Sequence, residues 1–218
     1  MIKYEFINDY VFNLMPKMSK SILDVGCGTG GFGKRLKAVN THIIVDGITY
    51  SKEEKEVAEK YLDNVYVQDI NASVIEFKSK YDCVILSHVL EHTLKPKDIY
   101  ENVIDNIEIG SYVLIALPNV LFYKQRFKFL LGEFKYSKNG GLMDETHYHF
   151  FSWDEALVMI KDVRITLEKT VVEGAAPLLF LRRILPNRIL KEIDLFFGRV
   201  FPGLFGLQFC FLIKKVRE

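Results

Sequence analysis

The stretch "SILDVGCGTGGFG", residues 21–33, decides how this chain is expected to fold. A short apolar run leads to Asp24, and five glycines then fall within eight residues, at positions 26, 28, 30, 31 and 33. Glycine loses more backbone freedom on ordering than any other residue, so this density suits a place where a ligand approaches the main chain closely. The stretch therefore predicts a strand, a ligand-binding turn and the start of a helix.

The segments on either side of this turn alternate between strand and helix patterns. Strands are predicted at 21–25, 42–46, 64–69, 81–87 and 111–118, and helices at 4–15, 31–39, 51–62 and 95–107. The strands are apolar with little alternation, as expected when helices cover both faces of a parallel sheet. We therefore expect a doubly wound α/β fold.

The last third of the chain breaks this rhythm. A helix is predicted at 152–162 and strands at 163–172 and 207–216, which brings the expected sheet to seven strands, with the last one antiparallel. Two apolar segments with basic residues interrupt the pattern, at about 119–150 and 175–206. We expect a single domain over residues 1–218, with these two segments as cap-like insertions.

Composition narrows the function classes. The formal net charge of +1 gives no sign of nucleic-acid binding. The three cysteines, Cys27, Cys83 and Cys210, are far apart and odd in number, so we expect neither a disulfide framework nor a metal site, and a reducing compartment fits. The N-terminus lacks the pattern of a signal peptide, which favours a cytoplasmic protein.

Ligands bind at the carboxyl edge of such a sheet, where the glycine turn lies. Gly26, Gly28 and Gly31 match the G-x-G-x-x-G spacing of dinucleotide-binding proteins, whereas Gly26, Gly28 and Gly30 match G-x-G-x-G. Both spacings are present, so a nicotinamide-dependent dehydrogenase remains an alternative at this point.

The residues around the glycines favour one family. "LDVGCGTG", residues 23–30, resembles the first motif of class I S-adenosylmethionine-dependent methyltransferases. The resemblance implies S-adenosylmethionine as the cofactor, bound by the turn that contains Gly26, Cys27, Gly28 and Gly30, with Asp24 at the methionine end. A carboxylate suits an ammonium group and would repel a pyrophosphate. Alternatively, Asp24 only caps the turn.

The resemblance continues through the segments that would bind the ribose and the adenine. "GITYSKEE", residues 47–54, has Thr49 where many members carry an acid, as in the cyclopropane-fatty-acid synthase branch. By this match Thr49 and Glu54 serve the ribose, Tyr50 packs on the adenine, and Asp46 is an alternative ribose ligand. In "VQDIN", residues 67–71, Asp69 and the Ile70 backbone N–H would bind the adenine, although Asp69 can also cap a helix at 72–79.

Two further stretches resemble segments near the reacting methyl group. "YDCVILSHVLEHT", residues 81–93, is similar to the fourth-strand signature of small-molecule methyltransferases and places Ser87 and His88 at the sulfonium end. "MDETHYHFFSWDEA", residues 143–156, resembles a subgroup found with surface-polysaccharide and other sugar-modifying enzymes. His147 is the first candidate for a general base and His149 the second, and His88 is a further catalytic candidate. Alternatively, His147 bonds a backbone carbonyl and only fixes the loop.

The acceptor is not encoded in any motif. The predicted function is O- or N-methylation of a small molecule, a sugar or a lipid-linked glycan, and the basic and apolar segment at 176–206 predicts a cap over the site, a dimer face or peripheral membrane contact. Two alternatives remain beside the dehydrogenase: a non-enzymatic S-adenosylmethionine-binding module and a membrane-surface interaction protein. The sequence does not predict the oligomeric state.

Overall fold

The computed structural model describes residues 7–178 and 181–218, so the first part of the predicted helix at 4–15 lies outside the described residues. Within them, seven strands form one sheet in the order β3-β2-β1-β4-β5-β7-β6. Their bounds are Ser21–Val25 for β1, Ile44–Thr49 for β2, Asn64–Val67 for β3, Cys83–Ser87 for β4, Tyr112–Pro118 for β5, Ile165–Gly174 for β6 and Gly206–Lys215 for β7. β7 runs antiparallel to β5 and β6, and the remaining neighbours are parallel. The predicted fold class is confirmed.

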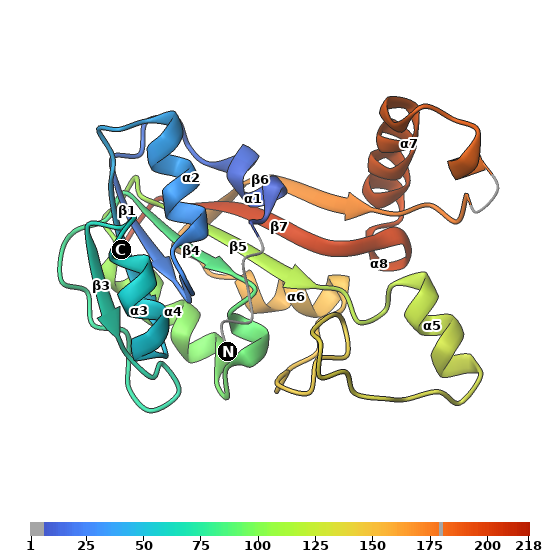
Figure 1. Ribbon diagram of the computed structural model, residues 1–218, viewed down its shortest axis with the longest axis horizontal. Coiled ribbons are helices and arrows are strands. Elements are labelled where there is room, and N and C mark those ends of the chain that lie inside the picture. The colour runs from blue at the N-terminus through green and yellow to red at the C-terminus, as the bar shows by residue number, and fades with distance from the viewer. Residues whose placement is uncertain (1–6, 179–180) are drawn as a thin grey trace.

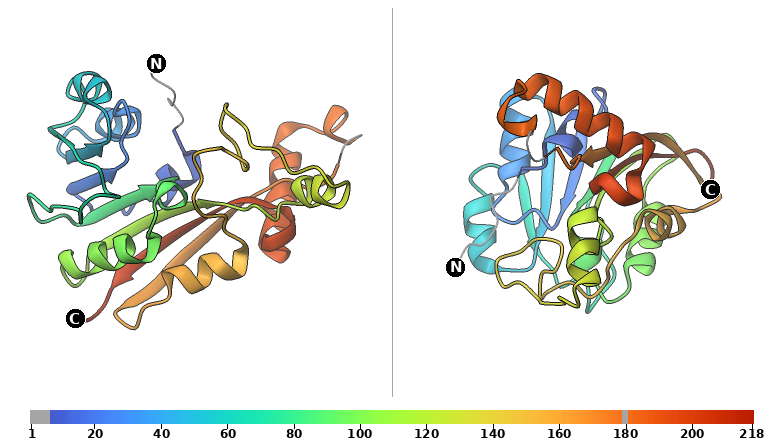
Figure 2. Two further views of the ribbon diagram at one scale, coloured as in Figure 1. Left: turned by 90° about the horizontal axis from the view of Figure 1, so that it is seen from below. Right: turned by 90° about the vertical axis from the view of Figure 1, so that its right-hand side faces the viewer.

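Helices cover both faces of the sheet (Figures 1 and 2). One face carries α1 (Asp9–Leu14), α2 (Gly31–Val39) and α3 (Lys52–Ala58), and the other carries α4 (Pro96–Asn106) and α6 (Trp153–Ile160). Neighbouring residues of one strand pack into different layers: Ile22 joins the cluster under α1–α3 and Leu23 the cluster over α4 and α6. The strands are apolar throughout because both faces are buried.

The two segments expected to be insertions meet at one end of the molecule. α5 (Tyr123–Leu130), α7 (Asn187–Val200) and α8 (Pro202–Phe205) lie beyond the carboxyl end of β5, at the right of Figure 1. The Arg126 guanidinium donates to the Gly203 carbonyl at 3.0 Å, and the Asn119 amide donates to the Gly206 carbonyl at 2.7 Å. These bonds join the segment after β5 to α8 and to the first residue of β7.

The prediction of a helix at 72–79 is wrong. The Asp69 side chain accepts a hydrogen bond from the Asn71 N–H at 2.9 Å, which forms a turn. The Gln68 side-chain amide then donates to the Val74 carbonyl at 2.6 Å and takes an acceptor that a helix would use. Ile75 is buried at 3% exposure while Val74 stays 69% exposed, so the segment lies irregularly over the core. Throughout the described residues, every helix is too short or too polar to cross a lipid bilayer.

The packing of α7 on β6 provides a test of this arrangement. A Cβ atom on Gly174 would lie 1.8 Å from the Asp194 carbonyl oxygen of α7. Gly174→Ala should therefore lower the free energy of unfolding by about 1–3 kcal/mol, the usual cost of overpacking, as measured by urea denaturation. Gly203→Ala is the control, because its Cβ would meet Trp153 at an ordinary 3.5 Å. Equal stability of the two variants would contradict the close contact.

Candidate active site

A cavity of about 940 Å³ opens over the carboxyl ends of β1, β2 and β4. These strands meet where the sheet order reverses, which is the usual ligand site of an open α/β sheet. Its walls are completed by the segment 68–71, by the loop 140–147 and by Gln208 at the start of β7. Of the site residues predicted from the sequence, three do not line it: Gly30, Asp46 and His149.

The glycine turn forms the floor of the cavity and is held by the end of the neighbouring strand. The N–H groups of Gly26 and Cys27 both donate to the Ile48 carbonyl, at 2.8 and 2.9 Å. Gly28 has φ +51°, in the region that L side chains rarely adopt, and it faces the cavity. α2 starts at Gly31 with no side-chain cap, so its first N–H groups are available to an anionic group. Gly30 packs against α3 instead.

Asp24 is the most unusual charged group of the site. It lies at the end of β1, lines the cavity and is only 5% exposed. Among the described residues, none forms a hydrogen bond or an ion pair with its carboxylate. Burial alone raises the pKa of Asp24 from 3.8 to about 7. A buried carboxylate without a partner is unfavourable when ionised, so this position favours a cationic ligand.

The predicted ribose ligands separate into two sites. Thr49 donates a hydrogen bond to Glu54, and both residues line the cavity together with Tyr50, which is 74% exposed. Asp46 does not line the cavity and is buried. Its carboxylate accepts hydrogen bonds from the Asn64 amide at 2.9 Å and from the Tyr81 hydroxyl at 2.8 Å. The structure thus brings Thr49 and Glu54 together at the cavity and leaves Asp46 outside it.

His88 is the centre of a polar network that the sequence did not reveal. Its Nδ1 contacts Glu91 Oε1 at 3.0 Å, and its Nε2 contacts Oε1 of the Gln208 side chain at 2.9 Å. The Gln208 amide donates to Glu173, and the Asn8 amide donates to Gln208. Gln208 therefore presents an acceptor to His88, so that both ring nitrogens of His88 donate.

This doubly donating geometry favours the charged ring. Burial by itself lowers the pKa of His88, but the hydrogen bond and charge of Glu91 outweigh it, with Gln208 and Glu173 adding to the effect, and the pKa is raised overall. His88 also has φ +56°, the only positive φ of a non-glycine residue among those described. The strand end therefore turns sharply where Ser87 and His88 enter the cavity.

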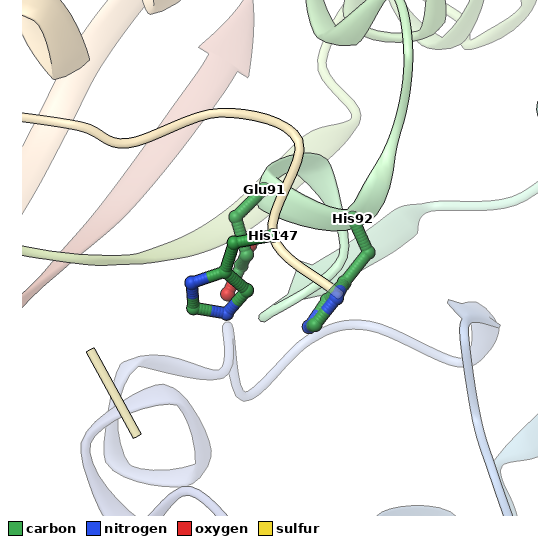
Figure 3. Close-up of side chains that lie close together, drawn as sticks. All are labelled: Glu91, His92 and His147. Atoms are coloured by element: carbon green, nitrogen blue, oxygen red, sulfur yellow. The ribbon is translucent and has the colours of Figure 1, made fainter. Parts of the chain in front are cut away.

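The segment after residue 143 is fastened to the turn that follows β4, the 3-10 helix η1 (Leu90–His92). The backbone N–H groups of Tyr148 and His149 donate to the Glu91 carbonyl at 2.9 and 3.1 Å. As a result, His147 enters the cavity beside His92, with the ring centroids 4.7 Å apart, whereas the His149 ring contacts the Leu94 carbonyl outside it. Figure 3 shows Glu91, His92 and His147 turned toward one another. Burial lowers the pKa of His147, which favours its neutral ring.

A family model covers most of this chain. The family described as methionine biosynthesis protein MetW matches residues 7–193. The chain belongs to this family. None of the curated proteins compared with it matches.

Solved structures share the fold of this MetW-family chain over nearly its whole length. A SAM-dependent methyltransferase from Archaeoglobus fulgidus is 20% identical, with 94% of this chain and 90% of that chain covered and a TM-score of 0.59. The plantazolicin methyltransferase BpumL, solved in complex with SAH, is 18% identical, with coverage of 95% and 80% and a TM-score of 0.61. A possible histamine N-methyltransferase from Thermotoga maritima is 15% identical, with coverage of 96% and 86% and a TM-score of 0.61. The predicted class I methyltransferase fold is confirmed.

The unpaired Asp24 carboxylate gives a test of the site in this MetW-family chain. Because the pKa of Asp24 is raised in the folded state, the native protein holds a proton between about pH 4 and pH 7 that the unfolded chain releases, so stability falls as the pH rises. Asp24→Asn should remove this fall of stability with rising pH. The variant should be more stable than the wild type at pH 8, with a gain that shrinks by up to about 1.4 kcal/mol per pH unit as the pH falls from 7 to 4.

Urea denaturation at several pH values measures this difference. Glu168→Gln, which removes an exposed carboxylate on β6, controls for the change in net charge. A gain that is the same at pH 4 and pH 8 would contradict a raised pKa at Asp24.

Proposed function

We propose that this protein is an S-adenosylmethionine-dependent methyltransferase that acts on a small-molecule acceptor, at an oxygen or a nitrogen atom. The observation that carries the proposal is the buried, unpartnered Asp24 carboxylate beside the start of α2, which has no side-chain cap on its first N–H groups. An amino-acid end of a ligand carries both an ammonium and a carboxylate group, and these two features would bind one each. A pyrophosphate would meet the same carboxylate unfavourably, which argues against the nicotinamide-dependent alternative.

The remaining parts of the cofactor have matching surfaces along the cavity. Thr49 and Glu54 would bind the ribose hydroxyls, and the exposed Tyr50 ring would pack on the adenine. Asp69 and the Ile70 N–H would bind the adenine edge. Ser87 and His88 would then border the sulfonium group, and the neighbouring loop 140–147 would bound the acceptor.

The chemistry requires little beyond positioning. An acceptor lone pair attacks the methyl carbon in line with the S–CH3 bond, the bonding electron pair moves to sulfur, and an O–H or N–H acceptor gives up one proton. His147 is the better candidate than His88 to receive that proton, because its lowered pKa keeps the ring neutral while both nitrogens of His88 already donate. His149 faces away from the cavity and is not assigned a role.

Titration calorimetry with S-adenosylhomocysteine and, separately, NAD tests the cofactor assignment. The wild type should bind S-adenosylhomocysteine at pH 8 and not NAD. Gly28→Val should abolish this binding, because it adds a branched side chain at a cavity-lining position with φ +51°. Gly203→Ala, which is remote from the cavity, should bind as the wild type does. Binding of NAD in preference would overturn the proposal.

The same titration has an expected pH dependence. The ligand ammonium needs Asp24 ionised, and Asp24 in the free protein has a pKa of about 7. Below that pH, binding must expel a proton, so the affinity should fall by up to about tenfold per pH unit. Asp24→Asn should bind weakly at every pH. Turnover with an acceptor panel then separates an enzyme from a non-enzymatic cofactor-binding module.

The finer class of acceptor, a sugar or a lipid-linked glycan, depends on the end of the molecule formed by α5, α7 and α8. Large apolar side chains are exposed there beside basic residues: Phe127, Leu130, Leu131, Ile184, Ile189, Phe196 and Phe201. Residues 179 and 180 of the segment 176–206 lie outside the described residues. Such a surface suits a partly apolar, anionic acceptor or weak contact with a membrane surface.

Flotation with anionic liposomes tests the membrane part of this proposal. The wild type should float at low salt and less at high salt, because basic side chains would supply part of the attraction. Phe196→Glu should reduce flotation, whereas Val163→Glu, at an exposed apolar position remote from α7, should not. If the wild type does not float, membrane contact is contradicted and the acceptor is a molecule in free solution.

A further inference from the structure

Three side chains from two separate segments converge on one wall of the cavity. Glu91 and His92 come from η1, and His147 comes from the loop fastened to it. Each offers one oxygen or nitrogen atom, and these three atoms lie within 4.8 Å of one another (Figure 3). Two imidazoles and one carboxylate are a donor set that divalent transition-metal ions accept.

The carboxylate of this group lacks a partner for one of its oxygens. Glu91 is 1% exposed, and its Oε1 contacts His88, but its Oε2 is buried without a hydrogen bond among the described residues. Leaving a buried carboxylate oxygen unsatisfied is costly. Nδ1 of His147 is buried without a hydrogen bond as well, so this one cluster holds two of the four such side-chain atoms found among the described residues. A cation between the three residues would satisfy the carboxylate.

The surroundings of His92 are those of a metal-bound imidazole. Its Nδ1 lies 3.2 Å from the Thr146 carbonyl oxygen and 3.0 Å from the Thr146 hydroxyl. The hydroxyl donates onward to Asp144 at 2.7 Å. A ligating histidine typically donates its second ring N–H to a carbonyl or carboxylate in this way, which fixes the orientation of the ring and leaves the other nitrogen to the ion.

We propose that Glu91, His92 and His147 bind one divalent transition-metal ion, with Zn²⁺ as the first candidate. Metal–nitrogen and metal–oxygen distances of about 2.0–2.2 Å require the three donor atoms to approach to roughly 3–3.5 Å of one another, which small side-chain rotations provide. Three protein ligands leave at least one position open toward the cavity, as in catalytic rather than structural sites.

The open position would take the acceptor, and this role of the ion rests on the proposed function. A bound ion would lower the pKa of an acceptor hydroxyl held there, so that the proton would leave to solvent water. The oxygen lone pair then forms the O–CH3 bond, and the electron pair of the S–CH3 bond moves to sulfur. His147 would act as a ligand in this arrangement instead of as a base.

Titration of the chelator-treated full chain with ZnCl2 tests the site. Calorimetry should show one equivalent bound, and Co²⁺ should give a visible absorption band from the same ligands. His147→Ala and Glu91→Gln should each weaken Zn²⁺ binding by at least about 10–100-fold, the range seen even for partners of metal ligands. His149→Ala is the matched control: it removes a histidine two residues away whose ring contacts the Leu94 carbonyl, and it should bind Zn²⁺ as the wild type does.

Parallel titrations with S-adenosylhomocysteine separate this inference from the proposed function. Circular dichroism and thermal unfolding first establish that each variant is folded, and Glu91→Gln keeps the shape of the side chain if His147→Ala does not fold. No Zn²⁺ binding by the wild type, or equal binding by all three variants, overturns the metal site even if S-adenosylhomocysteine binds. Zn²⁺ binding that depends on His147 and Glu91, without any affinity for S-adenosylhomocysteine, supports the metal site and overturns the proposed function alone.

Discussion

The two hydrogen bonds from Gly26 and Cys27 to the Ile48 carbonyl are the constraint on which the site depends. They tie the turn after β1 to the end of β2, and they use backbone groups only, so the side chains of the turn can be absent where a ligand approaches. A Cβ atom on Gly26 would lie 2.7 Å from Val89 Cγ2, so the turn after β4 closes over the same point. The ends of β1 and β2 are thereby tied to each other, and the turn after β4 packs against the same point.

Glu91 fixes the opposite wall by both its backbone and its side chain. Its carbonyl accepts from Tyr148 and His149, which docks a segment more than fifty residues away in the chain, and its carboxylate holds His88. Because the chain bends at Tyr148, where two successive N–H groups donate to the one Glu91 carbonyl, His147 enters the cavity and His149 does not. One residue of η1 thus decides which histidine can act in the site.

The parts of the fold that were predictable from the sequence are those with local signals. The glycine turn and the apolar strands depend on neighbouring residues, and each predicted strand overlaps a strand of the structure, although β2 was predicted at 42–46 and spans Ile44–Thr49. Asp46 could not be excluded from the cavity in this way, because its partners, Asn64 and Tyr81, are 18 and 35 residues away.

Gln208 was missed for the same reason: its partners are distant in the sequence. Its bond to Asn8 spans 200 positions, and its only local signal was one amide directly before the apolar run 209–213 of β7. The helix expected at 72–79 failed for a local reason: the Gln68 side chain binds the Val74 carbonyl, an acceptor that the helix would use. A pattern of apolar residues does not predict when a polar side chain will replace the backbone hydrogen bonds of a helix.

Two buried carboxylates determine the electrostatics of the cavity, although the formal net charge of the whole chain is +1. Asp24 and Glu91 are 5% and 1% exposed, and each has unsatisfied capacity for a cation. Burial makes each interaction with a cation stronger than it would be at the surface, and it also makes each empty position costly. Asp24 borders the glycine turn and Glu91 borders the loop 140–147, so the two carboxylates that favour a cation lie on different walls of one cavity. An ammonium group at the first and a metal ion at the second would satisfy both and leave the space between them for the sulfonium and the acceptor.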